Sequence, residues 1–162
     1  MIVGVDISSR RVDLSWLDQG KPQRWHVELG GPKTHLIDRV RACRIPWHDV
    51  LWDGEVTDIA IEYPFGRSRA GVAALMAVAG VVTHSAPTWA RVAWPSAGEL
   101  RAAIGAKNNK QAAHDALLEI CAWNDHDTRL GWNAVADWNE HELDALVACI
   151  GWTRILAAQD AA

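Results

Sequence analysis

Three β-rich stretches open the chain and constrain its fold more than any other feature. They lie within the first 29 residues and read MIVGVDIS, VDLSWLD and QRWHVEL. The connections between them, SRR and DQGKP, are short, and the second is a turn signal. Short turns join neighbouring strands that run in opposite directions. We therefore predict an antiparallel three-stranded meander.

The remaining segments alternate between helical and strand patterns. We predict helices at residues 32–53 (interrupted at Pro46), 67–82, 95–104, 108–123 and 137–158, and strands at 57–64 and 90–94. This order is typical of an α/β fold with a five-stranded mixed sheet flanked by helices. We expect one domain over residues 1–158 and a short tail at 159–162.

Length and composition set the class of protein. A chain of 162 residues has room for one ordinary domain, and 49% hydrophobic with 22% charged residues is usual for a soluble globular protein. No apolar run has the length of a membrane span, and the charges near the N-terminus follow its apolar stretch, unlike in a signal peptide. We expect a cytoplasmic protein. Three widely spaced cysteines predict neither disulfides nor a zinc site.

The distribution of charge matters more than its sum. A net charge of -4 argues against a nucleic-acid partner, because phosphates are bound largely by Lys and Arg. Residues 66–111, however, contain six Lys or Arg and one acidic residue. Chance could produce this segregation in a short chain, but it is also compatible with a surface that follows a phosphate backbone.

Two acidic residues stand in or next to apolar strands. Asp6 is the only charge in MIVGVDI, and Glu62 ends the run DIAIE. An unpaired buried carboxylate is unfavourable, so each needs a polar partner. If the first and fourth strands are neighbours, both carboxylates meet at one sheet edge, where Mg²⁺ or Mn²⁺ would relieve their repulsion. Alternatively, each caps a turn or pairs with an arginine such as Arg10 or Arg67.

The last predicted helix carries a second polar pair. His141 and Asp144 are three residues apart and share one face. Periodicity alone leaves open whether they are functional. We interpret Asp137, Glu140 and Glu142 as a solvated N-terminal turn that the helix dipole favours. The other histidines, His114 among them, show no shared ligand spacing and are expected to be surface or hydrogen-bonded core residues.

Four segments in this order resemble the RuvC family of Holliday junction resolvases, which have the ribonuclease H fold. They are GVDIS, IEYPF, the basic stretch VAWPSAGELRAAIGAKNNKQAAHDAL and HELDALVAC, and together they cover roughly residues 1–152. The resemblance implies a homodimeric, metal-dependent nuclease that cuts four-way DNA junctions. A nuclease for forks and flaps, as in virus-encoded relatives, and a non-catalytic nucleic-acid-binding module on the same fold are the alternatives.

The resemblance also implies roles for particular residues. Two Mg²⁺ or Mn²⁺ ions would be held by Asp6, Glu62, His141 and Asp144. His141 stands where many relatives have aspartate. An aromatic residue would stack on bases at the junction, and basic residues would bind the DNA backbone or approach the scissile phosphate: Phe65, Arg67, Arg69, Lys107 and Lys110. We expect the small-residue helix over residues 67–82 to form the dimer interface.

Overall fold

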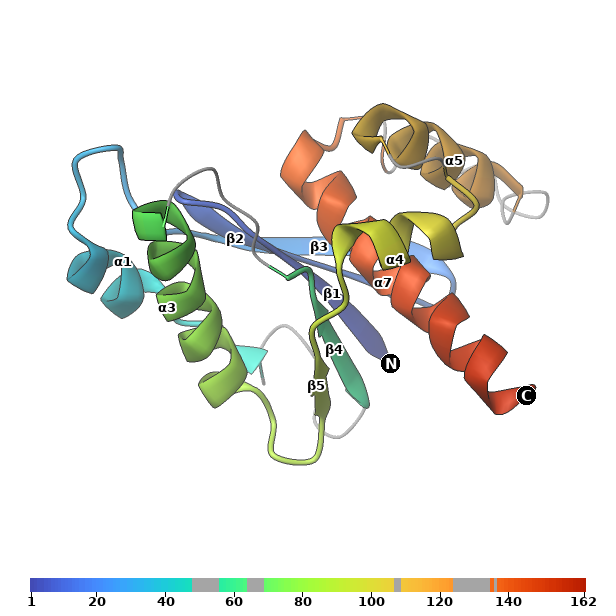
Figure 1. Ribbon diagram of the computed structural model, residues 1–162, viewed down its shortest axis with the longest axis horizontal. Helices are drawn as coiled ribbons and strands as arrows, with labels where there is room; N and C mark the ends of the chain where they lie inside the picture. The colour runs from blue at the N-terminus through green and yellow to red at the C-terminus, as the bar shows by residue number, and fades with distance from the viewer. Residues whose placement is uncertain (48–55, 64–68, 107–108, 124–134, 136) are drawn as a thin grey trace.

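The predicted meander forms one half of a five-stranded mixed sheet (Figure 1). The computed structural model describes residues 1–47, 56–63, 69–106, 109–123, 135 and 137–162. The strands are β1 (Ile2–Ile7), β2 (Arg11–Asp18), β3 (Lys21–Glu28), β4 (Asp58–Ile61) and β5 (Arg91–Ala93). Their order is β3-β2-β1-β4-β5. The pairs β1–β2 and β2–β3 are antiparallel, whereas β4 pairs in parallel with both β1 and β5. The expected α/β fold is confirmed.

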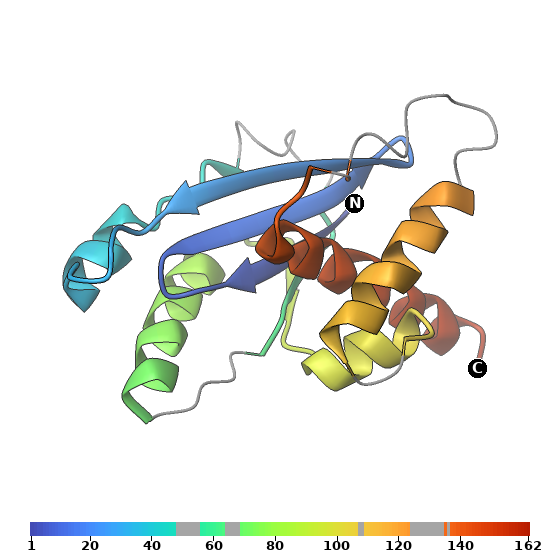
Figure 2. The same ribbon diagram turned by 90° about the horizontal axis from the view of Figure 1, so that it is seen from above.

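Helices cover both faces of this sheet. In the described part of the chain they are α1 (Leu36–Ala42), α3 (Arg69–Ser85), α4 (Ala97–Ala103), α5 (Lys110–Trp123) and α7 (Glu140–Asp160). Figure 1 shows α1 and α3 on one side of the sheet and α4, α5 and α7 on the other. In Figure 2, α5 lies across α7, with which it packs.

The first helix is shorter than the sequence predicts. Residues 32–35 form no helix, because Arg39 donates hydrogen bonds to the carbonyls of Gly31 and Thr34 and holds this segment as a loop. The helix ends at Ala42, before Pro46, whose ring disfavours helical backbone in the residue that precedes it. The predicted part over residues 48–53 lies outside the described residues.

Alternation along β1 divides the core into two clusters. Val3, Val5 and Ile7 belong to the cluster that contains the buried side chains of α3. Ile2 packs in the second cluster, with residues of α4, α5 and α7. Gly4 shares the face of Ile2, and Asp6 comes next on that face. Strand β1 therefore presents a carboxylate to the side of the sheet on which α7 lies.

The three cysteines are all buried and unpaired, as predicted. Among the described residues, no helix is long and apolar enough to cross a lipid bilayer.

Gly4 allows α7 to lie against β1. A Cβ atom at this position would stand 1.9 Å from the carbonyl oxygen of Ala145 and 2.3 Å from the backbone nitrogen of Cys149. Both contacts are with backbone, so rotation of a side chain cannot relieve them. The absence of a side chain at Gly4 thus sets the distance between the strand and the helix.

We expect Gly4→Ala to destabilise the protein by about 3 kcal/mol, the upper end for overpacked cores, because α7 must move away from the sheet. Gly98→Ala is the control, since Gly98 is exposed and a Cβ there would meet only Ser96 Oγ at 3.9 Å. Urea unfolding followed by circular dichroism measures both. Equal midpoints for the two variants would contradict the close-packing explanation.

Candidate metal centre and active site

The predicted site residues lie where two parallel strands end beside the start of α7. Asp6 is the second-last residue of β1, and Glu62 directly follows β4. The backbone N–H of Glu62 donates to the carbonyl oxygen of Val5 at 3.1 Å, which keeps the two strand ends together. The first and fourth strands are therefore neighbours, which is the condition under which the sequence predicts that both carboxylates meet at one sheet edge. The first two turns of α7 add His141 and Asp144.

Three of the four predicted ligands form a tight group. One ligand atom each of Asp6, His141 and Asp144 lies within 4.8 Å of the others. His141 Nδ1 is 2.8 Å from Asp6 Oδ2, a hydrogen-bond distance. This hydrogen bond raises the pKa of His141, although burial opposes the shift. The group joins the sheet to α7 through side chains that can bind a metal ion.

Glu62 lies at the edge of this group rather than inside it. Its pKa is raised to about 7, first by burial and then by the negative charges of Asp6 and Asp144. The three carboxylates are thus near enough to repel one another. A divalent cation would remove that repulsion, and oxygen ligands with one imidazole suit Mg²⁺ or Mn²⁺. The donor set therefore fits the metal that the sequence predicts.

Two nitrogen-bearing side chains from α5 lie against Asp144. Lys110 Nζ is 2.5 Å from Asp144 Oδ2 and 3.5 Å from Glu140 Oε2. His114 Nε2 is 2.9 Å from Asp144 Oδ1. Burial alone would raise the pKa of Asp144, but hydrogen bonds with His114 and Lys110 hold it below its usual value. Asp144 is therefore kept ionised.

The contact between His114 and Asp144 was missed by the sequence analysis. His114 is buried, and its partner is a candidate ligand rather than an ordinary core group. Lys110 and His114 are four residues apart on one helix, which places both on the same face. The four-residue spacing could have shown that both side chains share one face of α5, but the sequence does not show which element that face contacts.

The interpretation of Glu142 as a solvated residue is wrong. Asp137 and Glu140 are exposed, as expected, but only 5% of Glu142 is accessible to solvent. Its carboxylate accepts a hydrogen bond from the backbone N–H of Asn139 and forms ion pairs with Arg11 and Arg24. Buried carboxylates persist when charged partners compensate for lost hydration, and β2 and β3 supply those partners.

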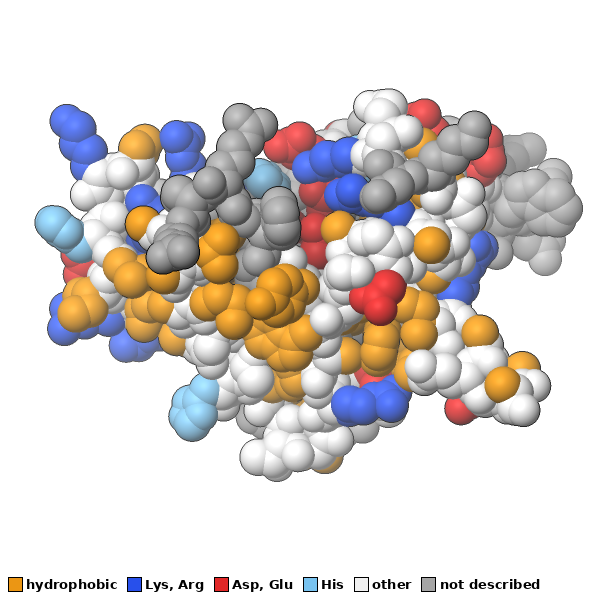
Figure 3. All heavy atoms as spheres, in the orientation of Figure 1, with side chains coloured by type: hydrophobic (Ala, Val, Ile, Leu, Met, Phe, Trp, Pro, Cys, Tyr) orange, Lys and Arg blue, Asp and Glu red, His pale blue; other side chains and the backbone are white. Residues whose placement is uncertain are grey.

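The predicted DNA-binding residues are only partly described. Phe65, Arg67 and Lys107 lie outside the described residues. Arg69 is the first residue of α3, and its side chain is not among those described. Arg101 of α4 is not among the predicted residues, but its positive charge lowers the pKa of Glu62, so it lies near the site. Figure 3 shows acidic and basic side chains together on this face, between α3 and α5.

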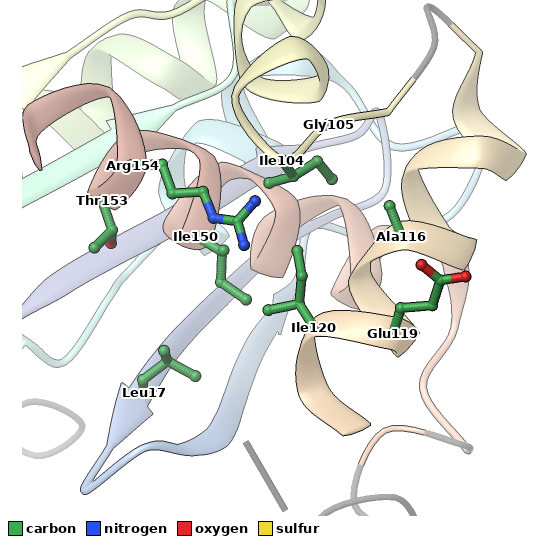
Figure 4. A pocket seen from close by; sticks show the side chains of 9 residues that line it. All are labelled: Leu17, Ile104, Gly105, Ala116, Glu119, Ile120, Ile150, Thr153 and Arg154. Carbon is green, nitrogen blue, oxygen red and sulfur yellow. The ribbon is translucent and has the colours of Figure 1, made fainter. Parts of the chain in front are cut away.

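A separate groove lies between α4, α5 and α7 (Figure 4). It has a volume of about 590 Å³ and is lined by Leu17, Ile104, Gly105, Ala116, Glu119, Ile120, Ile150, Thr153 and Arg154. None of the predicted site residues is among them. The groove is therefore distinct from the carboxylate cluster.

Comparisons with known proteins bear on the fold. No protein-family model matches the chain, and no curated protein matches it. Its structure is similar to that of Thermus thermophilus RuvC in complex with a Holliday junction substrate, with a TM-score of 0.73 and 15% identity over 97% of this chain and 94% of that chain. A second structure of Thermus thermophilus RuvC gives a TM-score of 0.65 and 15% identity, over 98% and 96% of the two chains. Neither match supports a viral origin. The chain has a RuvC-like, ribonuclease H-like fold, as its four sequence segments led us to expect.

Proposed function

We propose that the chain is a single nuclease domain (residues 1–158) that resolves four-way DNA junctions in a metal-dependent reaction. The observation that carries this proposal is the tight group of Asp6, His141 and Asp144, with Glu62 at its edge. Further support comes from the fold, because the similar RuvC structure holds a Holliday junction substrate. Acidic residues that meet on this fold are suited to binding the divalent cations that assist phosphodiester hydrolysis.

The carboxylates and the imidazole would hold two Mg²⁺ or Mn²⁺ ions. When bound, such ions supply an activated water and stabilise the leaving 3′ oxygen in an in-line displacement. The chain's own residues prepare the site. His114 and Lys110 keep Asp144 ionised, and the hydrogen bond to Asp6 orients the ring of His141. We propose that Lys110, whose ammonium lies at Asp144, also neutralises negative charge on the scissile phosphate.

DNA would reach this site across the basic part of the chain. We propose that Arg67, Arg69, Lys107 and Lys110 contact the phosphate backbone and that Phe65 stacks on bases at the junction. Arg101 joins this set because its charge acts on Glu62. Affinity that rests on phosphate contacts falls steeply with salt and does not depend on base sequence.

A dimer through α3 would place two such sites on one junction, so that two strands receive paired nicks. Helix α3 buries Val78, Ala79 and Val82 in the core, whereas Met76 is 38% exposed on another side of the helix. Figure 3 shows hydrophobic side chains gathered between α3 and β5. Small residues along the exposed side would allow two copies of α3 to approach closely.

The direct test uses three labelled DNA substrates: a four-way junction, a Y-shaped fork and a linear duplex. Each is incubated with the protein in Mg²⁺ and in EDTA. We expect Mg²⁺-dependent, paired nicks in the junction alone. Cleavage of the fork as well would favour a general nuclease for branched DNA, and a gel shift without cleavage would favour a non-catalytic binding module.

We expect Asp144→Asn to reduce junction cleavage by at least about 100-fold, because even outer-shell partners of a metal contribute about 10–100-fold. Junction binding should persist, since the substitution keeps the side chain's size and removes only its charge. Asp160→Asn makes the same chemical change at the exposed end of the same helix and should cleave like the parent. Cleavage by Asp144→Asn at the parent rate would refute the proposed ligand set.

For the dimer, we expect Met76→Glu to yield monomers in light scattering at micromolar concentration, because it places two like charges at the interface. Ala157→Glu adds the same charge at an exposed position of α7 and should remain dimeric. If the parent is itself a monomer and still makes paired nicks, the α3 interface is wrong.

A further inference from the structure

Four charged side chains, two of them buried carboxylates, form a cluster next to the candidate metal centre. They are Arg11 and Asp13 of β2, Arg24 of β3 and Glu142 of α7, called here the ion cluster. Arg11 Nε donates to Asp13 Oδ2 at 2.9 Å, and Arg11 Nη2 donates to Glu142 Oε1 at 3.3 Å. Arg24 Nη1 donates to Glu142 Oε2 at 2.5 Å. The Asp13 side chain is fully buried, and that of Glu142 is 7% exposed.

The charges of this cluster balance. Two guanidinium groups face two carboxylates, and burial raises the pKa of Asp13 while Arg11 opposes that shift. His26 has a ring nitrogen within 4.8 Å of ligand atoms of Asp13 and Glu142, which resembles a second metal site. The guanidinium groups already occupy both carboxylates, so the ion cluster is better explained as a structural connection than as a cation site.

The ion cluster connects the sheet to the first turn of α7. Glu142 Oε2 accepts from the backbone N–H of Asn139, closing the capping box at the start of the helix. Ser15 Oγ of β2 donates to the backbone carbonyl of Glu142 at 3.1 Å. Figure 2 shows this end of α7 against β2 and β3. The helix start is thus bound to the sheet through both backbone and side-chain atoms.

Members of the ion cluster lie next to the proposed metal ligands both on the sheet and on α7. Asp13 lies opposite Asp6 in the register of β1 and β2. Glu142 directly follows His141 and stands two residues before Asp144. Below this turn, the backbone of α7 lies against Gly4 of β1, which has no side chain that could interlock with the helix. The ion cluster adds a constraint on the rotation and shift of the helix start.

We infer that Arg24 and Glu142 are positioning residues that set the distance between Asp6 on the sheet and His141 and Asp144 on α7. The inference rests on the proposed function, since it concerns the metal centre of that nuclease. The physical reason is ligand spacing, because carboxylates bind a divalent ion well only when the distance between them matches the size of the ion. Loss of Arg24 would free the first turn of α7 and weaken cation binding.

Arg24→Gln tests this inference because two explanations predict opposite signs. By charge alone, removing a positive group near the site should strengthen binding of a cation. If Arg24 acts through position, binding should weaken, and we expect at least about a tenfold loss, as for outer-shell partners of a metal. Mn²⁺ titration by calorimetry in the absence of DNA measures this directly.

Arg91→Gln is a closely matched control. Arg91 Nε lies 2.5 Å from a carboxylate oxygen of Asp58, and its guanidinium lies 5.7 Å from the ring centre of Trp152. Arg24 makes the corresponding ion pair and lies 5.2 Å from the ring centre of Trp138. Each variant loses an ion pair with a carboxylate and a contact with a tryptophan ring, and Arg24→Gln also loses the hydrogen bond to Asp137 Oδ2 at 3.2 Å. Only Arg24→Gln loses its contacts at the start of α7. Arg91→Gln should bind Mn²⁺ as the parent does.

Junction kinetics give a second readout. At saturating Mn²⁺, Arg24→Gln should lower kcat and leave KM for the junction within about threefold, because ligand spacing affects the reaction more than DNA binding. Urea unfolding of both variants checks that they fold. Suppose that the parent binds Mn²⁺ and cleaves the junction, but Arg24→Gln binds Mn²⁺ as tightly as the parent or more tightly. The inference would then be overturned, and the proposed function would stand. A parent that binds no Mn²⁺ and cleaves nothing would overturn the proposed function and the inference with it.

Discussion

The direct contact between α7 and β1 determines most of what the site can do. Gly4 leaves the strand without a side chain at the point where the backbone of α7 crosses it. The helix can therefore approach until its first two turns reach the end of β1. Asp6 then meets His141 and Asp144, although 135 or more residues separate them along the chain. A larger residue at position 4 would separate the two halves of the site.

This approach concentrates negative charge, and the fold compensates for it in two ways. Within the site, Lys110 and His114 of α5 face Asp144, while burial, followed by the negative charges of Asp6 and Asp144, raises the pKa of Glu62 to about 7. Beside the site, arginines of β2 and β3 neutralise Asp13 and Glu142. The residual repulsion among the carboxylates is the physical reason to expect a cation there.

The predictable parts of the structure are those encoded by short-range patterns. Three β-rich stretches with short connections indicated the meander, and isolated acids in apolar strands identified Asp6 and Glu62 as anomalies that needed a partner. The roles of His114 and Glu142 could not be obtained in this way. Each depends on a contact between elements that are distant in sequence, and a charge near a helix start ordinarily indicates solvent. Only the packing of α5 and of the β2–β3 hairpin against α7 reveals their partners.

We propose that the group of Asp6, His141 and Asp144 is a metal centre. The most direct measurement is an anomalous difference map from crystals of the protein grown without DNA and soaked in Mn²⁺. We predict a peak in coordination contact with the carboxylates of Asp6 and Asp144, with the ammonium of Lys110 displaced from Asp144. A fully soaked crystal with no peak at this group, and with Lys110 still paired to Asp144, would contradict the claim.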